Sequence, residues 1–132
     1  MSAVLALWLS ASIKGHEFIE PAFWEAQVEH MRKVYIPASE THVYVLDGTV
    51  VAFYSLRDED LAALFVAPGF QGRGIGEALL EDAGRRRTML TLSVYKENKA
   101  GCEFYLKRGF SIISEGICEH TGHPEYIMRS GA

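Results

Sequence analysis

The chain has 132 residues, 48% of them hydrophobic, and a net charge of −4. This length fits one domain, residues 1–132, with its own core. No apolar run is long enough to span a membrane, and no basic segment precedes a signal-like stretch. The longest basic run, Arg85 to Arg87, is too short to indicate a nucleic-acid partner. Two cysteines without CxxC spacing, Cys102 and Cys118, indicate free thiols in a reducing, cytoplasmic setting.

Charge is distributed unevenly along the chain. Residues 1–67 are acidic overall, whereas residues 68–110 hold more basic than acidic side chains. This pattern fits an ordinary solvated surface. It also fits an anionic ligand bound by the middle of the chain and a cationic ligand that approaches the front.

The first part of the chain predicts two helices. In residues 3–11, apolar side chains recur at helical spacing, and Gly15 is expected to end that helix. Pro21 suits the first turn of a second helix, which Pro37 would terminate.

Three strands are predicted next. Residues 42–46 alternate in polarity, Asp47-Gly48 is a typical hairpin turn, and residues 49–56 would form the return strand. Residues 61–66, LAALFV, form a continuous apolar run of the kind found in strands buried on both faces.

The remainder of the chain alternates between helices and strands. We expect a helix from Ile75 to about Arg87, a strand over 89–95, a helix over 98–108 that Gly109 closes, and strands over 110–114 and 126–129. The predicted fold class is therefore α+β, with a mixed, mostly antiparallel sheet and helices on both faces. At its centre, a β-α-β unit with a right-handed crossover would join two parallel strands.

The stretch between the third strand and the next helix, residues 66–76 (VAPGFQGRGIG), is rich in glycine. A helix N-terminus offers unpaired N–H groups and a partial positive charge, and glycines let an anion approach the backbone. Residues 71–76 are therefore predicted to cradle a pyrophosphate; the alternative is a plain glycine-rich loop. No Gly-Lys-Ser/Thr follows, as Walker A requires, and GRGIG is one residue short of GxGxxG.

Two motifs resemble the signatures of the GNAT family of N-acetyltransferases. The acetyl-CoA signature Q/R-x-x-G-x-G/A is matched by Gln71-Gly72-Arg73-Gly74-Ile75-Gly76, with the usual V-x-P before it as Val66-Ala67-Pro68. The second signature, N-x-x-A/G-x-x-F-Y-x-x-x-G-F, is matched by Asn98, Gly101, Phe104, Tyr105, Gly109 and Phe110. Two signatures in the right order are far more specific than either alone. Residues 15–19 and Phe23-Trp24 also resemble a bacterial subgroup that includes protein-lysine acetyltransferases.

The resemblance implies a GNAT-like fold and transfer of an acetyl group from acetyl-CoA to a cationic primary amine, without a metal. The amine would belong to a protein or peptide lysine, or to a small molecule such as a polyamine or an antibiotic. The implied cofactor-binding residues are Leu64, Phe65, Val66, Gln71, Gly72, Arg73, Gly74, Ile75, Gly76, Asn98 and Tyr105. Tyr105 would also be catalytic, as the general acid that protonates the departing thiolate.

Several points stay open at the level of sequence. Candidates for the general base are Asp58, Glu59, Asp60, His42 and Glu17, beside a water relay or deprotonation in bulk solvent. His16, Phe18 and Trp24 would line the acceptor pocket or pack in the core, and Phe104 is expected in the core. The spacing of Cys118, His120 and His123 matches no common metal site.

Three further expectations concern the whole chain. The family usually opens with a strand before its first helix, so here we expect that edge strand to be missing. A non-catalytic module that senses acetyl-CoA or recruits a partner is the alternative to an enzyme. The sequence predicts neither a nucleic-acid nor a membrane partner, and it leaves monomer and homodimer open.

Overall fold

The helices and strands expected from the sequence are present in the expected order. The computed structural model describes residues 2–130. Its elements are α1 (Ser2–Gly15), α2 (Pro21–His30), a π-helical turn η1 (Met31–Tyr35), β1 (Glu40–Leu46), β2 (Thr49–Arg57), β3 (Asp60–Val66), a 3₁₀ turn η2 (Pro68–Phe70), α3 (Ile75–Arg86), β4 (Thr91–Tyr95), α4 (Lys99–Lys107), β5 (Ser111–Ile117) and β6 (Pro124–Arg129). None of these helices combines the length and the apolar character needed to cross a membrane.

Local sequence signals explain where several elements begin and end. Pro21 lies in the first turn of α2, where the missing N–H of proline costs nothing. Asp47 and Gly48 have φ values of 48° and 77°, as the two central residues of a hairpin turn of type I′ require. Gly109, with φ of 91°, follows α4 and supplies the left-handed conformation that closes a helix.

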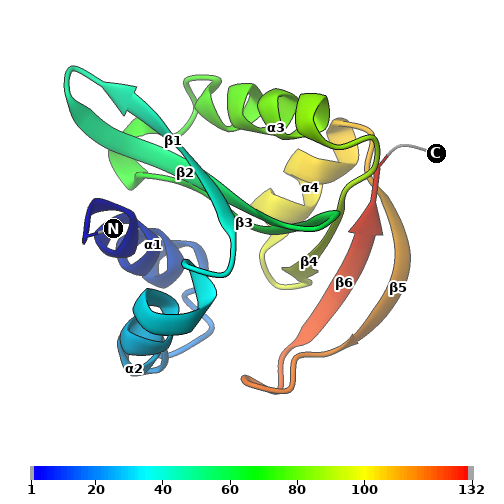
Figure 1. Cartoon of the computed structure of the whole chain (residues 1–132). Helices are drawn as coiled ribbons and strands as arrows, with labels where there is room; N and C mark the ends of the chain where they lie inside the picture. Colours follow the sequence, from blue (N-terminus) through cyan, green and yellow to red (C-terminus); the bar gives the residue numbers. More distant parts are fainter. Residues whose placement is uncertain (1, 131–132) are drawn as a thin grey trace.

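The six strands form one mixed sheet in the order β1-β2-β3-β4-β6-β5. The β3–β4 pair is parallel and the other neighbouring pairs are antiparallel, which confirms the predicted α+β class. Within residues 2–130, no strand precedes α1, so β1 lies at one edge of the sheet and β5 at the other (Figure 1).

The parallel pair β3–β4 is joined only where the two strands begin. Within residues 2–130, the one pair of residues that faces across the two strands in register is Asp60 and Thr91. The Thr91 N–H donates to the Glu59 carbonyl at 2.9 Å, and its hydroxyl donates to the Asp60 carboxylate at 3.2 Å. Beyond this pair of residues β3 remains paired with β2 and β4 with β6, but β3 and β4 no longer pair with each other, and the sheet separates into two halves (Figure 1).

Helices cover both faces of the sheet. On one face, α1 and α2 pack against Phe53 and Ala63. On the other, apolar side chains of α3 and α4 pack against Tyr54, Leu56 and Met128. Figure 1 shows the two helix pairs on opposite sides of the strands.

The strand that is buried on both faces is β2, rather than β3 as predicted. Residues 51–56 of β2 are all buried. In β3 the expectation is wrong for Ala62 and for the last three residues, Leu64, Phe65 and Val66, which are half-buried. The cause is the divergence of β4, which removes the neighbour that would have covered the last part of β3.

Gly84 tests the description of α3. It lies exposed inside this helix, and a Cβ added there would meet nothing within 4 Å. We expect Gly84→Ala to raise the free energy of unfolding by about 0.5–1 kcal/mol, since alanine loses less backbone entropy on folding. Denaturant unfolding measures the change. Gly76→Ala is the matched comparison and should lower stability, because its Cβ would lie 3.3 Å from the Phe104 ring. Equal effects at both positions would contradict this description of α3.

Candidate functional site

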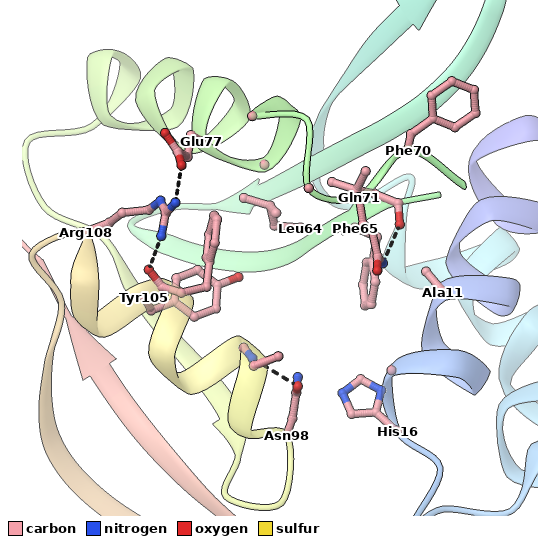
Figure 2. Close-up of a pocket in the computed structure, with 18 residues that line it drawn as sticks. Ala11, His16, Leu64, Phe65, Phe70, Gln71, Glu77, Asn98, Tyr105 and Arg108 are labelled. Atoms are coloured by element: carbon pink, nitrogen blue, oxygen red, sulfur yellow. Dashed lines mark hydrogen bonds and ion pairs between the residues drawn. The ribbon is translucent and has the colours of Figure 1, made fainter. Parts of the chain in front are cut away.

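A pocket of about 510 Å³ opens where β3 and β4 separate. Its walls are the end of β3, the glycine loop with the start of α3, one side of α4, and the C-terminal end of α1 (Figure 2). This volume lies within the range of small-molecule sites. The strand divergence therefore creates both the space and a stretch of β3 that is paired with β2 on one edge and has no strand partner on the edge towards β4.

The loop after β3 presents backbone rather than side chains to the pocket. Gly72 and Gly74 have φ values of +78° and +80°, and a Cβ added at either would meet nothing within 4 Å. Gly74 is also the N-cap residue of α3. The first-turn N–H groups of a helix lack carbonyl partners within it, so the loop forms a concave, electropositive surface suited to an anion.

Side chains of the loop make contacts with the rest of the protein. Gln71 donates a hydrogen bond from Nε2 to the Val66 carbonyl at 3.1 Å, which ties the loop to the end of β3. The Arg73 guanidinium lies over the Phe70 ring, 5.0 Å from its centre. Ile75 is buried in the core with 4% exposure. Of the predicted cofactor-binding residues, Arg73 and Ile75 are not among those that line the pocket.

Two glycines make room for side chains of the pocket walls, one between α3 and α4 and one within the first turn of α4. A Cβ on Gly76, in the first turn of α3, would meet the Phe104 ring of α4 at 3.3 Å. A Cβ on Gly101 would meet Asn98 Nδ2 at 2.6 Å. The Asn98 side chain caps α4 by accepting a hydrogen bond from the Gly101 N–H at 3.1 Å. Its carbonyl oxygen is therefore occupied by the helix, while the residue itself lines the pocket.

Tyr105 lines the pocket from α4, and its hydroxyl faces the open space (Figure 2). Its ring packs edge-on against Phe104 and Phe110, with centroids 5.1 and 5.4 Å apart. Burial raises the pKa of the Tyr105 hydroxyl well above its usual value, because the phenolate loses hydration in an apolar setting. At neutral pH, Tyr105 is thus a hydrogen-bond donor.

Arg108, Glu77 and Phe70 also line the pocket, and the sequence analysis missed all three. The Arg108 guanidinium lies 4.0 Å from the centre of the Phe104 ring, donates to the Phe104 carbonyl at 2.9 Å and forms an ion pair with Glu77. This ion pair links the start of α3 to the end of α4. No local pattern reveals a pair separated by 31 positions.

The α1 side of the pocket contains His16, which is buried. Its Nδ1 lies 3.0 Å from the Ser12 carbonyl, and burial lowers the pKa of the ring despite that bond. Trp24 is buried and packs edge-on against Trp8, so it belongs to the core. Phe18 lies outside the pocket lining and packs edge-on against Tyr95.

The other candidate bases do not line the pocket. Asp58 and Glu59 form the turn before β3 and Asp60 is its first residue, at the opposite end of that strand from Val66. His42 lies on β1, 2.6 Å from the Glu40 carboxylate. Glu17 is exposed beside His16.

The Cys118–His123 segment joins β5 to β6. Cys118 Sγ lies 3.3 Å from the Tyr95 hydroxyl, and His123 Nδ1 lies 3.0 Å from the Glu97 carboxylate. Among residues 2–130, no group of three or more histidine, cysteine, aspartate or glutamate side chains is arranged to hold a metal ion.

Comparison with known proteins identifies the family. Residues 37–112 match the acetyltransferase (GNAT) domain model. The chain is 35% identical, over 97% of its own length and 88% of the relative's, to the peptidyl-lysine N-acetyltransferase YiaC of Escherichia coli K12. The solution structure of apo YjaB from Escherichia coli aligns with a TM-score of 0.83 and 25% identity, covering 97% of this chain and 89% of that one. The PaiA N-acetyltransferase of Thermoplasma acidophilum, solved with coenzyme A, has the same fold, with a TM-score of 0.80 and 16% identity over 98% and 91% of the chains. With both signatures brought together at the walls of one pocket, this chain belongs to the GNAT family of acetyltransferases.

Proposed function

We propose that this protein transfers the acetyl group of acetyl-CoA to the side-chain amine of a lysine in a protein or peptide. The observation that carries the proposal is the pocket at the β3–β4 divergence, where the β3 edge that β4 leaves uncovered runs into the glycine loop at the N-terminus of α3. A coenzyme with a pyrophosphate, an amide-containing arm and a reactive end requires these features in this order.

The proposed position of acetyl-CoA follows from the polarity of each wall. The pyrophosphate binds the backbone of residues 71–76 at the start of α3, where N–H groups and the helix dipole favour an anion. The pantetheine arm carries amides, and it runs beside Leu64, Phe65 and Val66, pairing with their backbone as an added strand would. Asn98 faces the arm from the opposite wall.

The proposed chemistry needs one acid and one stabilised oxygen. As the amine attacks the thioester carbon, negative charge develops on the carbonyl oxygen, and a backbone N–H of β3 holds it. Tyr105 then protonates the departing thiolate. Its raised pKa keeps the hydroxyl protonated until that step.

Support for a lysine acceptor comes from relatives and from surface charge. YiaC, which matches nearly the whole chain, is named a peptidyl-lysine N-acetyltransferase. The loop after α1 carries the exposed acids Glu17 and Glu20. It contacts the β5–β6 turn through Phe18 and His123, whose ring centroids are 5.2 Å apart. Carboxylates beside the pocket favour the approach of a cationic side chain.

We also propose that the protein is cytoplasmic and that residues 1–132 form one domain. Cys102 and Cys118 are free thiols, which a reducing compartment preserves.

The acceptor is tested by measuring thiol release from acetyl-CoA with a matched panel of amines. We expect turnover with lysine-containing peptides that exceeds turnover with polyamines and aminoglycosides, because the peptide backbone adds contacts around the pocket mouth. Faster turnover of a polyamine or antibiotic would assign a small-molecule acceptor instead. Coenzyme binding without turnover of any amine would indicate a sensor and contradict the proposed activity.

The role of Tyr105 is tested by Tyr105→Phe. We expect kcat to fall roughly 10²-fold, with the Kd for CoA nearly unchanged, because the ring remains and only the proton donor is lost. Steady-state kinetics and calorimetry measure the two quantities. Tyr126→Phe, a half-buried tyrosine outside the pocket lining, is the control. If kcat for Tyr105→Phe equals that of the parent, Tyr105 is not the acid.

The phosphate cradle is tested by Gly74→Ala. An alanine at φ of +80° strains the helix start, and its Cβ enters the proposed pyrophosphate position. We expect the Kd for CoA to rise about tenfold, equivalent to about 1.4 kcal/mol, as measured by calorimetry. Gly69→Ala is the matched control, because that site has no atom within 4 Å and no left-handed φ. Unchanged CoA affinity in Gly74→Ala would place the diphosphate elsewhere.

A further inference from the structure

His16 occupies an unusual position for a histidine. It follows the last residue of α1, has 9% exposure, and lines the pocket whose opposite wall carries Tyr105 (Figure 2). Phe18, Trp24 and Tyr95 surround its ring, with centroids between 5.3 and 5.7 Å away. These contacts fix the plane of the imidazole, so the edge of the ring that carries Nε2 has one orientation.

The hydrogen bond to Ser12 fixes the tautomer as well. A carbonyl oxygen only accepts, so Nδ1, at 3.0 Å from the Ser12 carbonyl, must carry the proton. In the neutral ring, Nε2 is then an unprotonated acceptor. A backbone carbonyl on Nδ1 is also the arrangement that orients functional histidines elsewhere.

We propose that Nε2 of His16 is the general base that takes a proton from the acceptor ammonium in this pocket. The role rests on the proposed acetyltransferase function and adds a residue to it. The candidate bases Asp58, Glu59, Asp60, His42 and Glu17 lie outside the pocket lining, whereas His16 is part of it. The carboxylate that does line the pocket, Glu77, is held in an ion pair with Arg108.

The surroundings of His16 keep its ring neutral at physiological pH. Burial lowers its pKa below the ordinary value of 6.5. Tyr95, the titratable ring neighbour, has its pKa raised to about 12 and carries no charge. The charged groups near the loop are the exposed Lys14, Glu17 and Glu20, Glu97 beside His123, and the Glu77–Arg108 pair on the opposite wall. None of these acids contacts the imidazole, so no carboxylate holds a proton on it.

The acceptor ammonium loses two protons in the reaction, one to His16 and one to Tyr105 on the opposite side of the pocket. The acceptor ammonium gives its first proton to His16, and the free amine attacks the thioester carbon. The carbon–sulfur bond breaks, and the thiolate takes a proton from Tyr105. The new amide nitrogen gives its second proton to the Tyr105 phenolate, which restores the hydroxyl. His16 then releases its proton to solvent, and the products are the N-acetyl amine, CoA thiol and one proton.

Two substitutions separate a base from a structural residue. In His16→Asn, the side-chain Nδ2 occupies the place of imidazole Nδ1 and can still donate to the Ser12 carbonyl, but nothing replaces Nε2. In His16→Gln, an amide reaches the Nε2 position and cannot accept a proton to become charged. His30→Gln, an exposed histidine at the end of α2, is the matched control.

The assay is the pH dependence of kcat/KM with a lysine peptide and acetyl-CoA. We expect the parent to reach a plateau once His16 is deprotonated, at a pH below 6.5. Both variants should be roughly 10²-fold slower at pH 7. Their rates should climb with pH towards the pKa of the free amine, about 10.4, so that the deficit shrinks. CoA affinity should not change, since His16 lies opposite the cofactor wall.

Three outcomes overturn the role. A His16→Asn profile that follows that of the parent would show that only the Ser12 hydrogen bond matters. If the parent is active and both His16 variants are equally active, His16 is not the general base, and the proposed acetyltransferase function still stands. If the parent acetylates no acceptor at all, both the role of His16 and the proposed acetyltransferase function are contradicted.

A readout that is independent of turnover is the ¹⁵N NMR titration of the parent chain, which decides the question even if a variant fails to fold. A neutral ring with its proton on Nδ1 at pH 7 supports the role. A charged ring at pH 7, or a proton on Nε2, contradicts it.

Discussion

The separation of β3 from β4 is the constraint on which the rest of the structure depends. The two strands pair at Asp60 and Thr91 and then diverge, while β3 stays paired with β2 and β4 with β6. A continuous sheet would satisfy the backbone of Leu64–Val66 internally and would leave no opening at its centre. The divergence exposes that backbone, and the following loop places the N-terminus of α3 at the mouth of the opening. Strand, loop and helix therefore present hydrogen-bonding groups and positive potential along a single path.

The glycines of the two signatures have different physical tasks. Gly72 and Gly74 adopt left-handed conformations and present bare backbone. Gly76 and Gly101, by contrast, make room for protein atoms: the Phe104 ring in one case and the Asn98 side chain in the other. The Gly76 contact brings α3 and α4 together across the divergence, whereas the Gly101 contact lets the Asn98 side chain cap α4 at the pocket wall.

Much of this arrangement is predictable from local sequence, and the failures share a cause. Element order, the hairpin at Asp47-Gly48 and the glycine loop are encoded by neighbouring residues, and each is found as predicted. The burial of β3 was misjudged because it depends on whether β4 stays alongside, which the apolar run LAALFV does not encode. The Glu77–Arg108 pair likewise depends on a tertiary contact, between two helices. For His16 the sequence left two alternatives, the acceptor pocket or the core, and the packing of α1 against β3 places it in the pocket lining. The side chains of Arg73 and Ile75 turn away from the pocket because a loop that offers its backbone must direct its side chains elsewhere.

Burial acts on the two titratable groups that face each other across the pocket, and it acts in opposite directions. An apolar setting disfavours whichever form carries charge. For Tyr105 the charged form is the phenolate, so its pKa rises, and for His16 it is the imidazolium, so its pKa falls. A single physical cause thus leaves the donor protonated and the acceptor unprotonated over the same range of pH. A site that must both give and take a proton while a cationic amine becomes a neutral amide needs this pair of states. The packing of α1 and α4 around the pocket supplies both, without a charged partner for either group.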